Sequence, residues 1–284
     1  MPKKYGLVVD ITKCNGCYNC FLACRDEYCG NDYPGYSAAQ PYSGHFWMRI
    51  IEKERGQYPK VKVAYTAIPC MQCEKPTCID AASNKAVYKR PDGIVIIDPE
   101  KAVGQKEIVS ACPYRVIYWN EEKNLPQKCT FCAHLLDQGW KVPRCVEACP
   151  TGALVFGDLN DPNSEISKIM ANAKVEVLHP EYGLEPKVHY IGLPKRFIAG
   201  EVVFKDKKDE CAEGVKVTLT GNGTTKTVNT DNYGDFEFEG LEADKDYAVV
   251  LEHKGYATKK IKVKTKIDVY LGEIVLSKAI AKRS

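Results

Sequence analysis

The sequence of 284 residues has no long hydrophobic run: no stretch approaches the roughly 18 apolar residues that a membrane-spanning helix requires. The apolar segment at residues 5–9 is too short for the core of a signal peptide, and no small-residue cleavage site follows it. We therefore expect a cytoplasmic protein with no membrane span, which leaves the cytoplasm only if it is bound to an exported partner.

An excess of charge of one sign is also missing. The chain has 40 lysines and arginines and 37 aspartates and glutamates, and thus a net charge of +3. Acidic and basic residues alternate instead of forming blocks, which is typical of a solvated surface. So balanced a charge predicts no general attraction to nucleic acid or to an acidic membrane surface.

Motifs for substrate chemistry are absent as well. The sequence shows no arrangement of nucleophile and base and no phosphate-binding loop. We therefore predict that this chain has no catalytic residues of its own.

Cysteine, in contrast, is abundant, with 14 residues in the chain. So many cysteines serve either a disulfide framework in an oxidising compartment or metal ligation in a reducing one. Because no secretory signal is visible, metal ligation is favoured, and the spacing of the cysteines decides between the two.

The first four cysteines have the spacing C-x2-C-x2-C-x3-C and are Cys14, Cys17, Cys20 and Cys24. The same motif returns downstream, with residues 133–144 inserted between its second and third cysteines. This group comprises Cys129, Cys132, Cys145 and Cys149. Three cysteines so closely spaced can hold one [4Fe–4S] cluster, and in two-cluster ferredoxins the fourth cysteine of a motif ligates the other cluster.

Exchange of the fourth cysteines therefore predicts two clusters. The ligands of the first are Cys14, Cys17, Cys20 and Cys149. The ligands of the second are Cys129, Cys132, Cys145 and Cys24. Gly16 suits the tight backbone of the first loop, and Pro150 prevents the last cysteine segment from continuing as a helix.

The middle of the chain contains one complete set and the remains of another. The complete set predicts a third cluster, with the ligands Cys70, Cys73, Cys78 and Cys112. The same spacing places the missing ligands of a fourth cluster at Ala82, Ala102, Gln105 and Ile108. All four positions of one set are replaced together while its neighbour stays intact, which favours the exchanged pairing here too.

Some alternatives stay open. Isolated C-x2-C pairs often bind zinc, and the group at residues 70–78 could do so. Cys29 and Cys211 fit no ligand spacing and are interpreted as free thiols. Histidine ligation is not expected, because the five histidines lie outside the cysteine motifs; they are His45, His134, His179, His189 and His253.

The remainder of residues 1–197 predicts short elements between the cysteine groups. We expect strands at 46–51, 93–98 and 116–120 and a helix near 164–173. With the cysteine motifs, these elements predict an α+β fold with two ferredoxin-like modules, one of which has lost a cluster site.

Residues 198–284 differ in character and are expected to form a second domain. Short alternating strands are expected at 215–220, 236–239, 247–251 and 261–264, with glycine-containing turns between them. This pattern is typical of an antiparallel β-sandwich. The stretch 230–241, followed by Tyr247 and Gly255, resembles the Cna-B or carboxypeptidase-regulatory-like domain, which implies a structural or contact-forming role.

The four cysteine groups in this order resemble the iron–sulfur subunits of the dimethyl sulfoxide reductase family. Three clusters followed by a sandwich resemble the aromatic hydroxytransferase branch of that family, the pyrogallol to phloroglucinol type, and matching stretches lie at 33–36, 92–101, 118–122 and 127–137. The resemblance implies a heterodimer with a large catalytic subunit that carries molybdenum or tungsten on bis-molybdopterin guanine dinucleotide.

Three functions remain compatible with the sequence. The resemblance favours the electron-transfer subunit of such a hydroxytransferase. The alternatives are the electron relay of a net-redox reductase, hydroxylase or dehydroxylase, and a free-standing polyferredoxin. Three basic residues, Lys13, Lys128 and Arg144, lie beside predicted ligands, where a positive charge would favour a reduced cluster, although the sequence also allows them to be ordinary solvated charges.

Overall fold

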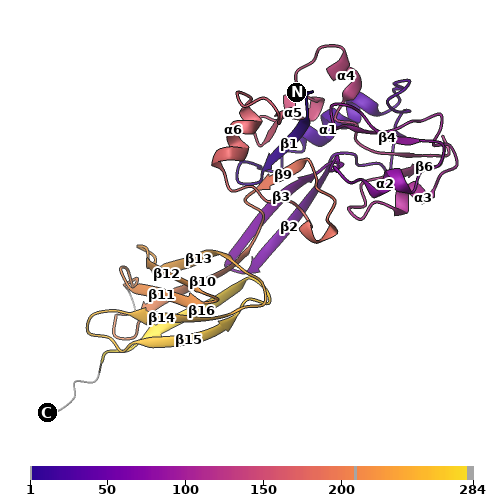
Figure 1. Ribbon diagram of the computed structural model, residues 1–284. Coiled ribbons are helices and arrows are strands. Elements are labelled where there is room, and N and C mark those ends of the chain that lie inside the picture. The colour runs from indigo at the N-terminus through magenta and orange to yellow at the C-terminus, as the bar shows by residue number, and fades with distance from the viewer. Residues whose placement is uncertain (1, 208–209, 280–284) are drawn as a thin grey trace. The chain divides into compact units, whose positions relative to one another are not determined.

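The computed structural model of the protein describes residues 2–207 and 210–279 (Figure 1). Backbone contacts divide the chain into two compact units. The first unit comprises Met1–Glu52 and Ala64–Leu193, and the second comprises Lys53–Val63 and Pro194–Ser284. The segment Lys53–Val63 therefore joins the second unit, although it lies within the first 197 residues of the chain.

A three-stranded sheet forms one side of the first unit. Strand β1 (Tyr5–Asp10) lies between β8 (Leu154–Asp158), which is antiparallel to it, and β9 (Val188–Ile191), which is parallel. Helix α6 (Glu165–Asn172) packs Ile166 against Val8 and Val155 of this sheet. The helix expected near 164–173 is thus confirmed, and the Ser164 hydroxyl caps it by accepting a hydrogen bond from the Ser167 N–H.

The cysteine-bearing segments of the first unit consist of loops, short helices and two-stranded ribbons. The helices are α1 (Asn19–Tyr28), α2 (Thr77–Asp80), α3 (Glu107–Ser110), α4 (Ala133–Asp137), α5 (Arg144–Glu147) and the 3-10 helix η1 (Pro180–Tyr182). The ribbons pair β4 (Val87–Lys89) with β5 (Val95–Ile97), and β6 (Tyr118–Asn120) with β7 (Leu125–Gln127). The strands expected at 93–98 and 116–120 are confirmed with shorter bounds, as β5 and β6.

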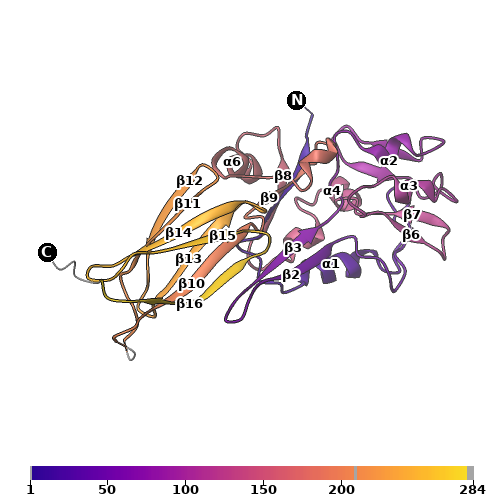
Figure 2. The same ribbon diagram turned by 90° about the horizontal axis from the view of Figure 1, so that it is seen from below.

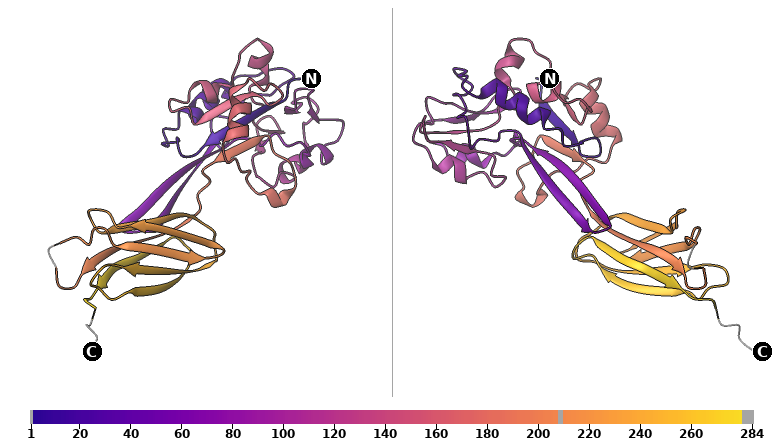
Figure 3. Two further views of the ribbon diagram at one scale, coloured as in Figure 1. Left: turned by 60° about the vertical axis from the view of Figure 1, so that its left-hand side comes forward. Right: turned by 180° about the vertical axis from the view of Figure 1, so that it is seen from behind.

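A long hairpin is formed by β2 (Arg49–Gln57) and β3 (Lys60–Ile68), purple in Figure 3. The strand expected at 46–51 lies partly outside β2, which begins at Arg49. Trp47, just before it, is buried against the Tyr28 ring, with the ring centroids 4.6 Å apart. The tip of the hairpin belongs to the second unit. Lys60 pairs there with Asp235 at 2.6 Å, and Lys62 pairs with Glu237 and Glu239.

The second unit is a sandwich of two sheets that share one apolar core (Figure 2). The first sheet has the order β13 (Asp235–Leu241), β10 (Arg196–Phe204), β16 (Val269–Leu276). The second has the order β12 (Thr224–Asn229), β11 (Lys216–Gly221), β14 (Asp246–Glu252), β15 (Lys259–Lys264).

The expectation of a purely antiparallel sandwich is wrong for one strand pair. β10 and β16 are parallel, with Val202 opposite Ile274 and Phe204 opposite Leu276. Parallel neighbours need a long crossover connection. The chain provides it because β10 is the first strand of the sandwich and β16 the last, with the whole second sheet between them in sequence.

Candidate iron–sulfur sites

The cysteine loops of the first unit share one backbone geometry. The third residue of the first C-x-x-C segment in each set has a left-handed backbone, with φ 72° at Gly16, 46° at Gln72 and 52° at Phe131. Such turns aim backbone N–H groups inward; the Phe131 N–H, for example, donates to Cys129 Sγ at 3.4 Å. The loops are therefore shaped to surround a negatively charged group.

The helices that follow these loops also repeat one arrangement. The next ligand of each set occupies the second residue of a helix: Cys20 in α1, Cys78 in α2 and Cys145 in α5. In the first and last cysteine groups, the fourth cysteine follows this helical ligand by four residues: Cys24 follows Cys20, and Cys149 follows Cys145. On α1 this spacing separates Cys20 from Cys24 by one helical turn, so a single helix serves two sets.

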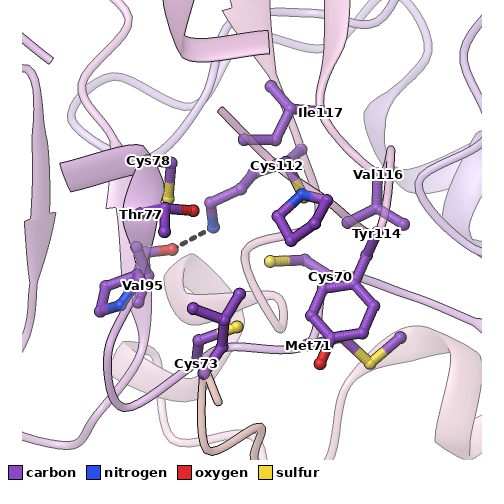
Figure 4. A pocket seen from close by; sticks show the side chains of 14 residues that line it. Cys70, Met71, Cys73, Thr77, Cys78, Val95, Cys112, Tyr114, Val116 and Ile117 are labelled. Atoms are coloured by element: carbon purple, nitrogen blue, oxygen red, sulfur yellow. Dashed lines mark hydrogen bonds between the residues drawn. The ribbon is translucent and has the colours of Figure 1, made fainter. Parts of the chain in front are cut away.

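The middle set surrounds a cavity (Figure 4). All four of its thiols line this space: Cys70, Cys73, Cys78 and Cys112. The other lining side chains are largely apolar and include Met71, Tyr114, Val116 and Ile117. The structure thus brings Cys112 to a loop more than thirty residues earlier in the chain.

The thiols of the first set line a second cavity and are Cys14, Cys17, Cys20 and Cys149. Cys17 is exposed and the other three thiols are half-buried, so this set is the most accessible to solvent. Hydrogen bonds from Thr151 Oγ1 and from backbone N–H groups overcome the effect of burial and lower the pKa of Cys149. These bonds favour the thiolate form that binds iron.

The remaining set is fully buried and consists of Cys24, Cys129, Cys132 and Cys145. Burial, followed by the negative charges of Cys129 and Cys132, raises the pKa of Cys24. Burial, followed by the charges of the other three thiols, likewise raises the pKa of Cys145. The four thiols are therefore close enough to act on one another.

The chemistry of these donors fits iron–sulfur clusters. Burial raises the pKa of Cys20, Cys73 and Cys129 to about 12, so these thiols keep their protons at neutral pH unless a metal displaces them. No three His, Cys, Asp or Glu side chains in the described part of the chain meet so as to hold a single metal ion. The thiols instead line cavities, and [4Fe–4S] clusters placed there would accept and donate single electrons.

The three basic residues beside predicted ligands differ in their exposure to solvent and in their ion pairs, which the sequence alone does not reveal. Lys13 is exposed and pairs with Asp10 at 3.5 Å, and Arg144 pairs with Glu27 at 3.3 Å. Lys128, in contrast, is only 2% exposed and lines the cavity of the middle set. Its positive charge opposes the effect of burial on the pKa of Cys78, which is nevertheless raised to about 11.

Gln72 is a residue whose role the sequence did not suggest. Its buried amide donates to the Cys129 carbonyl at 3.0 Å and accepts from the Val95 N–H at 2.8 Å. It therefore ties the loop of the middle set to a loop of the fully buried set. Only its place inside a C-x-x-C segment could have signalled this role.

Comparison with known proteins agrees with this architecture. The 4Fe-4S dicluster domain family matches residues 61–159, and the carboxypeptidase regulatory-like domain family matches residues 198–273. The chain is 42% identical over 260 residues to the pyrogallol hydroxytransferase small subunit of Pelobacter acidigallici, which covers 89% of this chain and 92% of that one. It is 33% identical over 199 residues to a tetrathionate reductase subunit of Salmonella typhimurium, which covers 69% and 75%. The chain belongs to the iron–sulfur subunits of the dimethyl sulfoxide reductase family.

As an iron–sulfur subunit of this family, the chain is an electron-transfer component of a molybdopterin enzyme. A sulfite dehydrogenase subunit of Allochromatium vinosum is a further relative, 36% identical over 202 residues, which covers 67% of this chain and 82% of that one. None of the helices in the described residues is long and apolar enough to cross a membrane.

The fold of this iron–sulfur subunit also assembles the four positions of the missing set. Ala102 and Ile108 are fully buried in one apolar cluster, and Ala82 packs against it. Gln105 lies beside them and exchanges hydrogen bonds with the backbone of Ser83. Packed side chains fill the space that a fourth set of thiols would line. We call this position, formed by Ala82, Ala102, Gln105 and Ile108, the filled site.

Proposed function

We propose that this chain carries three [4Fe–4S] clusters and is the small subunit of a cytoplasmic heterodimer. Its partner is a large catalytic subunit that binds molybdenum or tungsten on bis-molybdopterin guanine dinucleotide. The heterodimer acts as a hydroxytransferase on polyhydroxylated aromatic compounds. The reaction takes place in the large subunit, and this chain holds and tunes the clusters.

The similarity to the pyrogallol hydroxytransferase small subunit carries the proposal for substrate class. It extends over 89% of this chain, whereas the similarity to the tetrathionate reductase subunit extends over 69%. The three sets of four thiols support the cluster count. Each set has donors for one cubane, and burial keeps water away from most of them.

The filled site supports a reaction without net electron transfer. Transfer of a hydroxyl group between two aromatic molecules leaves the total number of electrons unchanged. A chain of clusters then needs no exit to an outside acceptor, and its task is to set or restore the oxidation state of the partner's metal. The apolar packing around Ile108 and Ala102 leaves no ligands at the fourth position where a longer relay would continue.

A net-redox relay is the second candidate. Relatives named as subunits of a reductase and of a dehydrogenase share about a third of their residues with this chain. The accessible first set, with its exposed Cys17, would suit electron exchange with a partner in either case.

The test is anaerobic isolation of the native protein with whatever copurifies, followed by iron, sulfide, zinc, molybdenum and tungsten analysis, EPR and assay. We expect about twelve irons per chain, a large molybdenum- or tungsten-containing subunit, and conversion of pyrogallol-type substrates without an added electron acceptor. Activity that requires an electron donor or acceptor would favour the relay. About eight irons with zinc would contradict the third cluster, and a fully loaded chain that purifies alone would contradict the heterodimer.

A further inference from the structure

Lys128 is the one buried lysine or arginine among the residues that the structure describes. It directly precedes Cys129 of the fully buried set. Its side chain also lines the cavity formed by the middle set. The ammonium group is therefore placed beside the thiols of two predicted clusters, out of contact with water.

The hydrogen bonds of Lys128 leave its charge without a counter-ion. Its Nζ donates to the carbonyl oxygens of Val95 and Cys129, the latter at 3.2 Å. Within the described residues, no carboxylate forms an ion pair with it. A buried charge without an opposite partner strongly destabilises a fold. The negative charge that balances Lys128 must therefore come from a group other than a carboxylate.

A cluster with four thiolates provides that charge in both of its oxidation states. We propose that Lys128 is the counter-charge of the cluster held by Cys70, Cys73, Cys78 and Cys112, and that it raises the reduction potential of this cluster. The inference rests on the proposed presence of a cluster at this site. Reduction adds one electron, supplied by a neighbouring cluster or an added reductant, and no proton. The negative charge thus grows by one, and a fixed ammonium stabilises the reduced form more than the oxidised form.

Lys13 is a matched control within the same chain. It directly precedes Cys14, as Lys128 precedes Cys129. The Lys13 side chain is 54% exposed, and its Nζ lies 3.5 Å from Asp10 Oδ2. Solvent and this carboxylate screen its charge, so its removal should leave the cluster potentials almost unchanged.

The test is an EPR-monitored redox titration of the anaerobic complex carrying K128M, K128R or K13M. Methionine keeps the length of the side chain but removes the charge. In K128M we expect one cluster to shift to a more negative potential by at least about 59 mV, a tenfold change in its one-electron equilibrium. K128R and K13M should keep all three potentials near those of the unchanged complex.

Unchanged potentials in K128M, with all clusters present, would overturn the inference while leaving the proposed function intact. If K128M loses about four irons and K128R retains them, the positive charge is needed to hold the cluster, which supports the counter-charge role. Loss of iron in both variants would overturn it, because shape and not charge would then be decisive. Zinc in the middle set of the unchanged complex would remove the cluster itself, and the proposed count with it.

Discussion

The middle of the iron–sulfur unit contains two sites with the same backbone frame, a loop with a left-handed residue followed by a helix. The retained site has four cysteines, Cys70, Cys73, Cys78 and Cys112, and the filled site has none. In the retained site, Gln72 has a left-handed backbone and Cys78 is the second residue of α2. In the filled site, Gly104 is left-handed, with φ 80°, and Ile108 is the second residue of α3. The frame therefore exists with and without ligands, and local chain geometry is sufficient to build it.

The two sites are stabilised in different ways. In the filled site, Ala102 and Ile108 are removed from water, and the Gln105 amide bonds to Lys101 and Ser83 carbonyls and to the Ser83 N–H. In the retained site, four thiols surround a cavity, and burial raises the pKa of Cys73 to about 12. Packing and backbone hydrogen bonds thus stabilise the filled site, whereas we expect a bound cluster to stabilise the retained site.

Removal of one ligand from the retained site should have the largest effect. In Cys112→Ala we expect the loss of about one to four irons per chain, because three thiols leave one iron of a [4Fe–4S] cluster without its ligand. Iron and sulfide analysis with EPR measures this loss. Cys29→Ala is the control, since Cys29 is a half-buried thiol outside the three sets. Full iron content in Cys112→Ala would show that Cys112 is not a ligand.

Restoring cysteines to the filled site should make the two sites alike. The quadruple variant A82C/A102C/Q105C/I108C should bind about four additional irons after anaerobic reconstitution, because its frame already has the geometry of the other loops. The triple variant that leaves Ala82 unchanged lacks the exchanged ligand and should not form the same cluster. A folded quadruple variant without extra iron would show that the frame has relaxed too far to accept a cluster.

The cysteine pattern predicts the sets because each repeat keeps one order, a C-x-x-C loop and then a helix whose second residue is the next position. The number of residues between loop and helix differs among the repeats, but the replaced positions Ala102 and Ile108 keep this order. The charge environment could not be predicted in this way. The pairs Lys13–Cys14 and Lys128–Cys129 are alike in sequence, and only the packing of β5 over Lys128 distinguishes them.

The long hairpin escaped prediction for a related reason. Residues 52–63 are mostly polar and their side chains mostly exposed; β2 shows no apolar alternation, and β3 alternates lysine with valine only over residues 60–63. Their tip is stabilised by contacts distant in sequence, such as Lys60 with Asp235. In the sandwich, alternation identified β11, β13, β14 and β15, whereas the parallel pairing of β10 with β16 depends on how the chain closes the sheet.

Packing in the filled site can be tested without iron. Ile108→Ala should destabilise the protein by about 2–5 kcal/mol, because it leaves a hole in a fully buried cluster. Iron content should stay unchanged. Anaerobic denaturation followed by circular dichroism measures the loss. Val103→Ala is the control: Val103 is 52% exposed, and its truncation should cost less than about 0.5 kcal/mol. Equal effects of both substitutions would contradict a packed site.

The smallest difference concerns the glycines of a loop with cysteines and of a loop without them. Both Gly16→Ala and Gly104→Ala place a side chain on a left-handed backbone, which costs about 1–2 kcal/mol. At Gly16 the new Cβ would also lie 2.5 Å from the Tyr65 ring, whereas at Gly104 its nearest neighbour is 4.0 Å away. We expect Gly16→Ala to destabilise the protein by about 1–3 kcal/mol more than Gly104→Ala.

Combining each substitution with Tyr65→Ala in a double-mutant cycle should remove this excess destabilisation at Gly16 and leave the effect of Gly104→Ala unchanged. If Tyr65→Ala does not relieve Gly16→Ala, contact with the Tyr65 ring is not the source of the excess.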